Sequence, residues 1–418
     1  MERAAGARRV TPLPPGRTDA FAALRHRNFR LFYGGQVLSL VGTWMQTTAL
    51  GWLVLELTDS EFLLGLVTAA TFFPILVFTL FAGVVADRID KRRILVVAQA
   101  LMCVVALVLA VLTDVGAINV WMILALVLLH GSGNAFEIPT RQSFFVELVG
   151  REDLTNAIAL NSSAFNLTRI IGPALAGFLI GAVGIASAFY LNAASYLFVI
   201  GALLAIRRPR PPKREQQASK WENLKEGIAY LRGDRLSRTL VGMVAMVSIF
   251  GLPYAMLMPV FARDILDVGA QGLGWLLAAT GIGALAGGMA LASHGTRVRR
   301  GRLLLISSVA FCILLAAFAL SRSFPLSLVL LAAFGFSMIL TTATANAIIQ
   351  SVVPDHLRGR VMAVYVFMFL GLNPVGSLQA GAVARWTSAP VALALGAAVL
   401  LVLVLAVWKR NPELREIA

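Results

Sequence analysis

The chain has 418 residues, of which 58% are hydrophobic and only 14% are charged, and long apolar stretches recur along its whole length. This composition excludes a soluble globular protein, which would need more polar surface to cover its core, and it indicates a membrane protein. The formal net charge of +15 does not favour nucleic-acid binding, because the basic residues lie in short clusters between the apolar stretches.

The apolar stretches predict an all-α membrane protein, because a spanning segment needs roughly 20 mostly apolar residues that satisfy their backbone hydrogen bonds internally. The short alternating strands of a β-barrel are not seen. Six helices are expected in the first half, at 29–55, 62–86, 93–113, 117–138, 156–181 and 185–206. Six more are expected in the second half, at 239–262, 271–293, 303–320, 324–348, 359–384 and 388–408.

Three polar segments flank or separate these helices. Residues 1–28 and 409–418 are expected to be cytoplasmic tails, and 1–28 lack the apolar core of a signal peptide. Residues 207–238 are expected to form a cytoplasmic loop with an extended, Pro-rich start. Within this loop, the stretch from Trp221 to Tyr230 predicts a helix at the membrane surface.

The Lys and Arg residues predict the orientation. With the N-terminus in the cytoplasm, 32 of the 36 fall on the cytoplasmic side, and only Arg263, Arg322 and Arg385 fall on the other. The remaining one, Arg169, lies inside a helix. This asymmetry obeys the positive-inside rule, requires an even number of spans and predicts a multi-pass protein of a bacterial inner membrane.

The two halves of the sequence resemble each other. GPALAG at 172–177 matches GSLQAG at 376–381, and Gln142–Ser143 matches Gln350–Ser351, with each pair expected just beyond an even-numbered helix. These matches are 204 to 208 residues apart, about half the chain. These matches indicate a duplicated six-helix unit. Transporters built from such repeats carry their substrate along a path between the two repeats.

The loop between the second and third helices holds a motif of glycine, acid and bases: Gly83, Asp87, Arg88, Arg92 and Arg93. It resembles the motif of the major facilitator superfamily at the same loop, although the usual glycine before the last basic pair is absent. The resemblance implies two pseudo-symmetric bundles with cytoplasmic termini. It also implies that Asp87 faces the start of the eleventh helix and holds the cytoplasmic side closed. The alternative is a tight turn with a topology-setting basic cluster.

The fifth helix carries a second motif, consisting of Arg169, Gly172, Pro173 and Gly177. Proline bends a helix and glycine permits close packing. The motif resembles in part the Gly-Pro motif of exporters in the superfamily, which implies efflux, whereas a simple kinked helix is the alternative. From about residue 20 to 408 the chain resembles the branch of secretion-type permeases that includes the enterobactin exporter. This wider resemblance rests on Trp44–Gln46, Gly51–Thr58, Pro139–Arg141, Asn156 and Arg358–Arg360.

The resemblance implies that helices 1, 4, 7 and 10 line a central cavity, and polar residues at helical spacing mark one face of three of them. The candidates on helices 1 and 4 are Gln36, Ser39, Thr43, Gln46, Thr47, His130 and Asn134. Helix 7 offers Met243, Met246, Phe250, Tyr254 and Met258, and helix 10 offers Ser337, Thr341 and Thr344. The flexible and aromatic groups of helix 7 favour an amphipathic or aromatic ligand. The alternative for each stripe is packing between helices.

Ionisable groups inside a membrane are costly, so each is a candidate for function. Glu137 and Arg141 lie one helical turn apart, and His130 lies above them. Proton coupling needs a titrating group, for which Glu137 is the first candidate and His130 the second. The alternative is a structural ion pair between Glu137 and Arg141.

The sequence lacks a phosphate loop, a zinc motif and a nucleophile elbow, and so does not indicate an enzyme. We expect no metal or cofactor, a small-molecule substrate, the lipid bilayer as the surroundings, no nucleic acid and a monomer. The leading hypothesis is export of a siderophore, drug or metabolite, driven by an ion gradient, which we expect to be of protons, through rocker-switch alternating access. Translocation of a lysophospholipid or similar lipid, and a sensor that binds without transport, are the alternatives.

Overall fold

The computed structural model describes residues 21–206, 220–294, 299–415 and 417, without the side chains of 79–88, 220–224, 294 and 415. Within these residues, twelve helical spans are long and apolar enough to cross a membrane, which confirms the predicted number. The first half contains α1 (Arg27–Thr58), α2 (Glu61–Arg88), α3 (Lys91–Asp114), α4 (Val120–Val149), α5 (Leu154–Ala182) and α6 (Ile185–Ala205). The second half contains α8 (Arg235–Met246), η2 (Val247–Gly251), α9 (Tyr254–Val260), η3 (Phe261–Ile265), α10 (Gly269–His294), α11 (Arg300–Leu320), α12 (Phe324–Val352), α13 (Asp355–Gly371), α14 (Asn373–Trp386) and α15 (Ala389–Arg410).

Two helices extend further than predicted. The fourth helix ends at Val149 instead of 138, so that Gln142–Ser143 lie inside it, and Gln350–Ser351 likewise lie inside α12. The expectation that both pairs follow a helix end was therefore wrong. Apolar side chains continue along α4 past the predicted end, and Phe145 packs edge-to-face against Phe29 of α1. This packing keeps the extension helical beyond the most apolar stretch.

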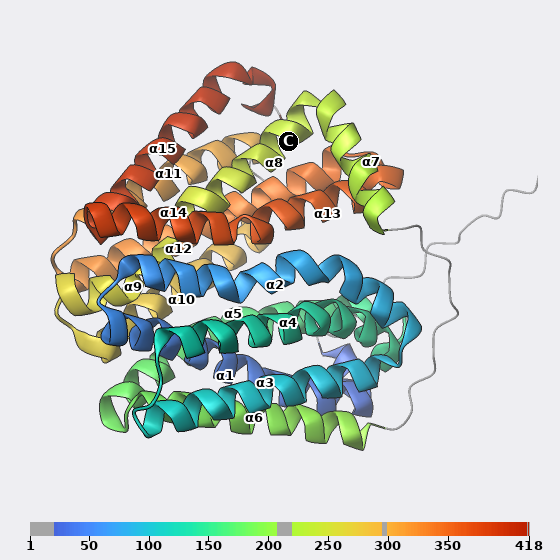
Figure 1. The fold of residues 1–418 in the computed structure, drawn as a ribbon. Helices are drawn as coiled ribbons and strands as arrows, with labels where there is room; N and C mark the ends of the chain where they lie inside the picture. Colours follow the sequence, from blue (N-terminus) through green and yellow to red (C-terminus); the bar gives the residue numbers. More distant parts are fainter. Residues whose placement is uncertain (1–20, 207–219, 295–298, 416, 418) are drawn as a thin grey trace, which may run out of the picture.

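The halves form two bundles that lie side by side along their length (Figure 1). In the first bundle α1 and α3 pack against α6, and α2 packs against α4. In the second, α12 packs against α10 and α11, and α11 packs against α15. The main contacts between the bundles are those of α5 with α10 and of α2 with α14. We call the end of the molecule where α1 begins the basic end, and the other the opposite end.

Glycines allow both contacts between the bundles to be close. A Cβ on Gly177 of α5 would lie 3.1 Å from the Cα of Gly274 of α10. A Cβ on Gly65 of α2 would lie 3.3 Å from the Cα of Gly381 of α14. Because a Cβ at these positions would crowd the facing backbone, small residues are what permit this approach. All four glycines lie toward the opposite end of their helices, so the bundles are in close contact there.

The repeated motifs occupy equivalent places in the two bundles. A Cβ on Gly172 would lie 2.4 Å from Cβ of Trp44 in α1, the first helix of its half. A Cβ on Gly376 would lie 3.0 Å from Cα of Ile249 in η2, part of the first span of the second half. The pseudo-symmetry inferred from GPALAG and GSLQAG is thus visible in what each motif packs against.

Two spans of the second half are interrupted. The seventh span changes to π-helix at Val247–Gly251 and again at Phe261–Ile265, with Pro253 between them. The eleventh span breaks at Leu372, two residues before Pro374. Proline removes a backbone donor, and π-helical turns often occur at functional sites. The turn at Val247–Gly251 and the break at Leu372 lie directly before residues that line the cavity described below, whereas the turn at Phe261–Ile265 lies at the opposite end.

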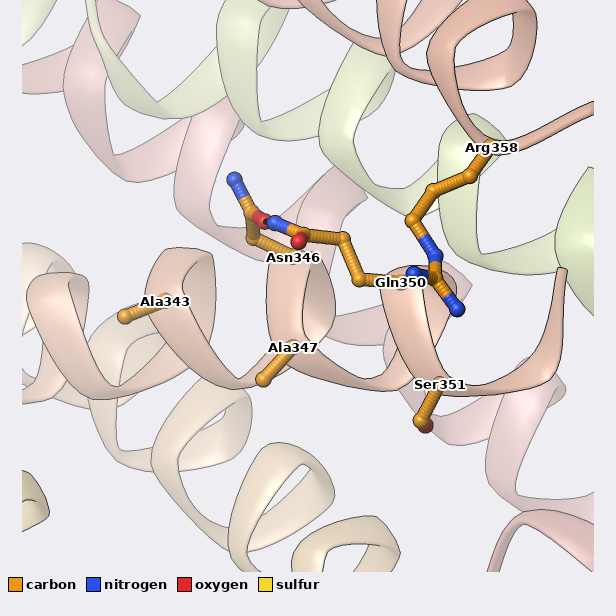
Figure 2. Close-up of a pocket in the computed structure, with 6 residues that line it drawn as sticks. All are labelled: Ala343, Asn346, Ala347, Gln350, Ser351 and Arg358. Carbon is orange, nitrogen blue, oxygen red and sulfur yellow. Dashed lines mark hydrogen bonds between the residues drawn. The ribbon is translucent and has the colours of Figure 1, made fainter. Parts of the chain in front are cut away.

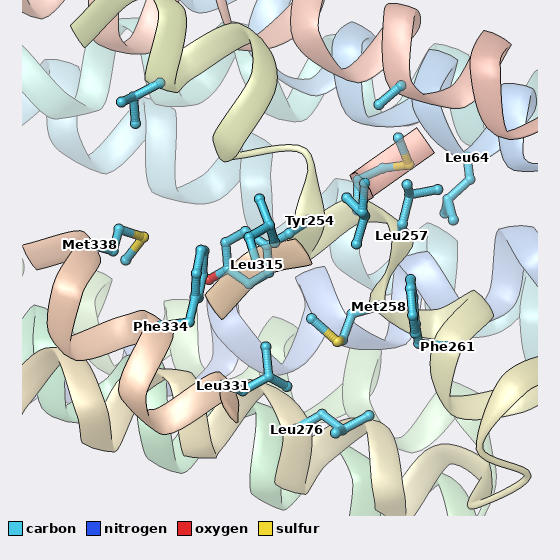
Figure 3. Packing of buried hydrophobic residues seen from close by; sticks show 14 of the residues in the cluster. Leu64, Tyr254, Leu257, Met258, Phe261, Leu276, Leu315, Leu331, Phe334 and Met338 are labelled. Atoms are coloured by element: carbon cyan, nitrogen blue, oxygen red, sulfur yellow. The ribbon is translucent and has the colours of Figure 1, made fainter. Parts of the chain in front are cut away.

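The largest apolar core cluster includes residues of both bundles, and much of it gathers around the seventh span (Figure 3). Tyr254 meets Phe334 of α12 edge-to-face, with ring centroids 4.7 Å apart, and Phe311 of α11 lies 4.8 Å from Phe334. Leu257 and Phe261, further along the same span, have no exposed surface. Of the residues expected to face a ligand on helix 7, Met243 and Met258 belong to this core, and Met246 and Phe250 pack against it.

The polar loop between the halves forms the predicted helix, as α7 (Lys220–Gly233). It packs against α13, where a Cβ on Gly227 would lie 2.6 Å from the carbonyl oxygen of Arg360. Glu226 forms an ion pair with Arg360. This helix is thus attached to the eleventh span at the basic end. Residues 1–20 of the predicted tail at 1–28 and the Pro-rich segment at 207–219 lie outside the described residues, whereas Ala22–Arg25 of the tail form a short 3-10 helix.

Candidate functional site: a cavity between the bundles

A cavity of about 290 Å³ lies between the two bundles. Its walls come from α1, α2, α4 and α5 of the first half and from α9, α10 and α14 of the second, with Leu252 before α9. Aliphatic and aromatic side chains make up most of the wall, among them Leu50, Phe72 and Leu273. A mostly apolar cavity with a few polar groups is the usual form of a small-molecule site.

Six of the candidate site residues named from the sequence line this cavity. They are Gln46, Thr47, His130, Arg169, Pro173 and Tyr254. They come from four different elements, which the fold brings together between the bundles. The polar stripes of helices 1 and 4 thus each contribute to the cavity, together with the motif of helix 5.

Among the described residues that line the cavity, Arg169 is the one with a permanent charge. Its Nη2 donates a hydrogen bond to the hydroxyl of Tyr254 over 3.1 Å, and its Cζ lies 6.0 Å from the centroid of the Trp44 ring. Trp44 belongs to the same bundle as Arg169, whereas Tyr254 belongs to the other. The guanidinium therefore lies where the two bundles meet, held by an aromatic face and a phenol.

His130 connects the cavity wall to a buried polar chain. Its Nε2 is 3.0 Å from the Tyr196 hydroxyl, and its Nδ1 is 3.2 Å from Nδ2 of Asn134. Asn192 continues the chain, because its Nδ2 donates to Gln46 Oε1 over 2.7 Å and lies 3.4 Å from the Tyr196 hydroxyl. The chain joins α4, α6 and α1 and reaches the cavity at both of its ends, through His130 and Gln46.

Glu137 and Arg141 form an ion pair away from the cavity. Arg141 Nε donates to Glu137 Oε1 over 2.7 Å, and Arg141 Nη1 donates to Asn161 Oδ1 over 3.1 Å. The side chains of Glu137 and Arg141 are only 5% and 11% exposed. The pair thereby links α4 to α5 and compensates the charge of both residues.

Several predicted cavity residues do not line the cavity in this structure. Thr341 of α12 donates to Ser307 Oγ of α11 over 3.1 Å, and Thr43 of α1 donates to the Ser39 carbonyl over 2.8 Å. These groups mediate packing, because Ser and Thr can satisfy their hydroxyls on nearby helices or on their own backbone. The other predicted residues that lie outside the cavity wall are Gln36, Ser39, Asn134, Met243, Met246, Phe250, Met258, Ser337 and Thr344.

Sequence reasoning missed the contributions of the second, fifth, eighth and eleventh helices. Thr68 and Thr71 of α2 and Asn373 and Ser377 of α14 all line the cavity. The available signal was the proline interrupting the eleventh helix at Asn373–Pro374, since broken helices mark the sites of many transporters.

The helix 2–3 motif is described only in part. Gly83, Asp87 and Arg88 lie in the last two turns of α2, and the side chains of Asp87 and Arg88 are not among those that the structure describes. Arg92 donates to the carbonyl oxygen of Leu204 over 2.8 Å and so binds the C-terminal turn of α6. Arg93 is exposed. The expected contact of Asp87 with the eleventh helix therefore stays a prediction.

A second, open pocket of about 490 Å³ lies near the basic end, between α12 and α13 (Figure 2). Asn346 and Gln350 project from the same face of α12, and Arg358 reaches toward it from α13. Arg358 forms an ion pair with Asp355 in the first turn of α13. This polar wall contrasts with the mostly apolar cavity between the bundles.

At the opposite end an ion pair joins the bundles. Arg263 Nη2 lies 2.6 Å from Asp59 Oδ1, and Arg263 Nη1 donates to the carbonyl oxygen of Leu55 over 3.1 Å. Asp264 also holds the guanidinium, with its Oδ1 2.6 Å from Nε. Arg263 thereby interacts with the C-terminal end of α1, where a cation is favoured by the helix dipole. It adds an electrostatic contact to the glycine contacts at this end.

Comparison with known families identifies one match along nearly the whole chain. The family described as transmembrane secretion effector matches residues 18–417. The chain is 29% identical over 389 residues to the multidrug efflux pump Tap of Mycolicibacterium fortuitum, covering 90% of this chain and 93% of that one. It is 25% identical over 350 residues to the staphyloferrin A transporter of Staphylococcus aureus, covering 84% and 87%. Identity to the macrolide efflux protein A of Streptococcus pyogenes is 24% over 360 residues, covering 83% and 87%.

Solved structures share the fold. The nucleoside transporter NupG superposes with a TM-score of 0.72 at 13% identity, covering 92% of this chain and 98% of that one. A bacterial homologue of the lysosomal transporter Spinster, in an inward-facing and unoccupied conformation, superposes with a TM-score of 0.73 at 14% identity, covering 96% and 98%. At these identities the similarity establishes the architecture alone.

Proposed function

The chain belongs to the transmembrane secretion effector family of major facilitator transporters, and we propose on that premise that it exports small amphipathic molecules. The observation that carries the proposal is the cavity between the bundles, with its aliphatic and aromatic wall and its few polar groups. The efflux pumps and the siderophore transporter among its relatives support export of a drug, siderophore or metabolite over uptake of a sugar. The Lys and Arg distribution supports a bacterial inner membrane with the basic end in the cytoplasm.

The proposed mechanism is a rocker switch. The bundles meet closely at the opposite end, through Gly177 with Gly274, through Gly65 with Gly381 and through Arg263 with Asp59. In the exporting step these contacts separate and the bundles close at the basic end, so that the cavity is exposed to the other side. A ligand moves this equilibrium only by the difference between its affinities for the two states.

Closure at the basic end is assigned to the helix 2–3 motif. Asp87 lies in the last turn of α2, and α13 begins at Asp355. A carboxylate facing the N-terminus of a helix is stabilised by the helix dipole, typically by about 0.3–1 kcal/mol. We assign Asp87 to this contact in the state that is closed at the basic end.

For coupling to protons, His130 is the residue that we propose. It lines the cavity and heads the buried chain through Tyr196 to Gln46. Imidazole is the side chain whose ordinary titration range lies nearest physiological pH. Glu137 is the weaker candidate, because its charge is compensated by Arg141. A proton gradient is thus proposed as the driving force, and no bound cofactor is required.

The proposed function is tested by transport from proteoliposomes that contain the purified protein and are loaded with a panel of amphipathic dyes and siderophores. Export of at least one panel member by the protein, absent from empty liposomes, supports the proposal. Folded protein that binds panel members and exports none would instead support a sensor.

A further inference from the structure

Resting on the proposed function, we propose that the cavity selects amphipathic molecules that carry an anionic group, a carboxylate above all, and that Arg169 binds this group. The starting point is the charge of the cavity wall. Arg169 is permanently charged, whereas no Asp or Glu is among the described residues that line the cavity. The wall therefore carries one positive charge that no lining carboxylate balances.

The carboxylates deepest in the described part of the first bundle are already engaged. Glu137 pairs with Arg141 in α4, and Glu147 pairs with Lys91 of α3. Within the described residues, Arg169 itself has no carboxylate within ion-pair distance. Its recorded partners are the Tyr254 hydroxyl and the Trp44 ring, which are both neutral.

These two partners orient the guanidinium without neutralising it. An arginine has five N–H donors, and Tyr254 accepts one of them. The donors that remain match the two oxygens of a carboxylate, which arginine binds in a bidentate manner. In a largely apolar cavity such a pair is stronger than in water, and a lone cation is costly. An anionic ligand therefore gains from binding and relieves the cost of the bare charge.

The rest of the wall suits an apolar body attached to such a group. Leu273 and Leu277 of α10 and Phe72 of α2 lie on it, and its hydroxyls are largely used within their own helices. Thr68 donates to the Leu64 carbonyl over 2.9 Å and Thr71 to the Val67 carbonyl over 2.9 Å. A cationic ligand of the same shape would meet the like charge of Arg169 and is disfavoured.

The second arginine-containing pocket does not offer the same chemistry. Arg358 is paired with Asp355 and its pocket is open, with Asn346 and Gln350 on the wall. A charge balanced by a carboxylate gives little preference for an anion. The proposed preference for an anionic ligand therefore belongs to Arg169 and not to Arg358.

The test measures equilibrium binding of three fluorescent probes to the full-length protein in lipid nanodiscs at neutral pH. The probes are dansylglycine, which is an anion, its neutral methyl ester, and dansylcadaverine, which is a cation. We expect the anion to bind about tenfold more tightly than the ester. A gain in affinity of this size is typical of one hydrogen bond to a charged group. The cation is expected to bind more weakly than the ester.

Variants locate the preference. Arg169→Gln should bind the anion and the ester equally, with the affinity that the parent protein has for the ester. Arg169→Lys should keep part of the preference for the anion. Arg385→Gln is the matched control, because it removes an exposed arginine at the end of α14, away from the cavity. This control should keep the full preference. Retained ester binding shows that a variant is folded.

Equal affinity for anion and ester in the parent protein would overturn the inference, as would an anion preference that survives in Arg169→Gln, or binding of no probe at all. Transport of the same probes separates this outcome from the proposed function. Export of the ester or the cation without anion preference leaves export standing and removes the role of Arg169. Arg169-dependent binding of dansylglycine without export of any probe supports the anion site and counts against the exporter.

Discussion

Arg263 at the end of the seventh span and Asp59 at the end of the first are 204 residues apart in sequence, and their side chains approach to 2.6 Å across the two bundles. Arg263 also donates to the Leu55 carbonyl, so that it holds both the charged side chain and the helix end of α1. This contact has to break when the opposite end opens. It therefore biases the equilibrium toward the state described here.

Arg263→Gln should shift the protein toward opening at the opposite end. The ion pair is partly exposed and contributes roughly 0.2–1 kcal/mol, so the open population should rise up to about fivefold. The readout is alkylation of a cysteine placed at Thr68 on the cavity wall, by a membrane-impermeant reagent applied from the side of the opposite end, after replacement of Cys103 and Cys312. Arg322→Gln, at the same end but bonded to its neighbour Ser321, should leave the rate unchanged. Equal alkylation rates in Arg263→Gln and Arg322→Gln would contradict the proposal that Arg263 holds the opposite end closed.

Gly177→Val should impair transport, because a Cβ there would lie 2.5 Å from the carbonyl oxygen of Ala270 in α10. Overpacking of this kind typically costs about 1–3 kcal/mol and would hold the bundles apart. Gly181→Val is the matched control, since no neighbouring atom lies within 4 Å of a Cβ at Gly181 on the same helix. Transport is measured at equal abundance in proteoliposomes. If the two variants transported equally, the close contact of α5 with α10 would not matter for the cycle.

Asp87→Asn should sharply lower flux while leaving membrane insertion and abundance intact, because it removes the charge proposed to face the eleventh helix. Asp90→Asn is the control. Asp90 accepts hydrogen bonds from the backbone N–H groups of Arg92 and Arg93 as the N-cap of α3, and asparagine caps equally well. Flux at equal expression is the measurement. Normal flux through Asp87→Asn would remove its gating role.

Glu137→Gln should destabilise the protein by about 3–5 kcal/mol, because it leaves the buried Arg141 without its carboxylate partner. Changing both members of the pair, as Glu137→Gln with Arg141→Gln, should recover most of that stability. Thermal unfolding in nanodiscs measures both effects. A single variant as stable as the parent protein would contradict the structural role of the pair.

His130→Asn should lower export driven by a proton gradient and leave exchange of substrate at equal pH intact. The physical reason is that asparagine keeps a polar group on the cavity wall but cannot take up a proton. Proteoliposomes with and without an imposed gradient give the comparison. Gradient-driven export by His130→Asn that equals export by the parent protein would contradict the proposed role of His130 in proton coupling.

The spans and the duplication were readable from the sequence because they depend on local properties. Hydropathy predicts each helix, and GPALAG and GSLQAG occupy equivalent places against α1 and η2. The far end of α4 was missed because Phe145 is stabilised there by Phe29, a long-range contact that hydropathy does not report.

The cavity was predicted only in part, because its lining depends on how the bundles tilt against each other. Gln46 and His130 of the predicted polar stripes line it, and so does Arg169 of helix 5, which was not expected on the wall, whereas Thr341 turns toward Ser307 of the neighbouring helix. A polar stripe marks a face that avoids lipid, and this face can belong either to a cavity or to a helix contact. The walls from α2 and α14 follow from the contact of these helices between the halves, which no periodicity shows.

The central claim is that this chain exports an amphipathic molecule through the cavity between its bundles. The most direct measurement is efflux from proteoliposomes loaded with amphipathic dyes, siderophores and lysophospholipids, with and without a proton gradient, compared between the parent protein and Gly177→Val. We predict gradient-dependent efflux of at least one drug-like or siderophore probe by the parent and its loss in the variant. Folded parent protein that moves no probe under either condition, or moves lysophospholipid alone, would contradict this account.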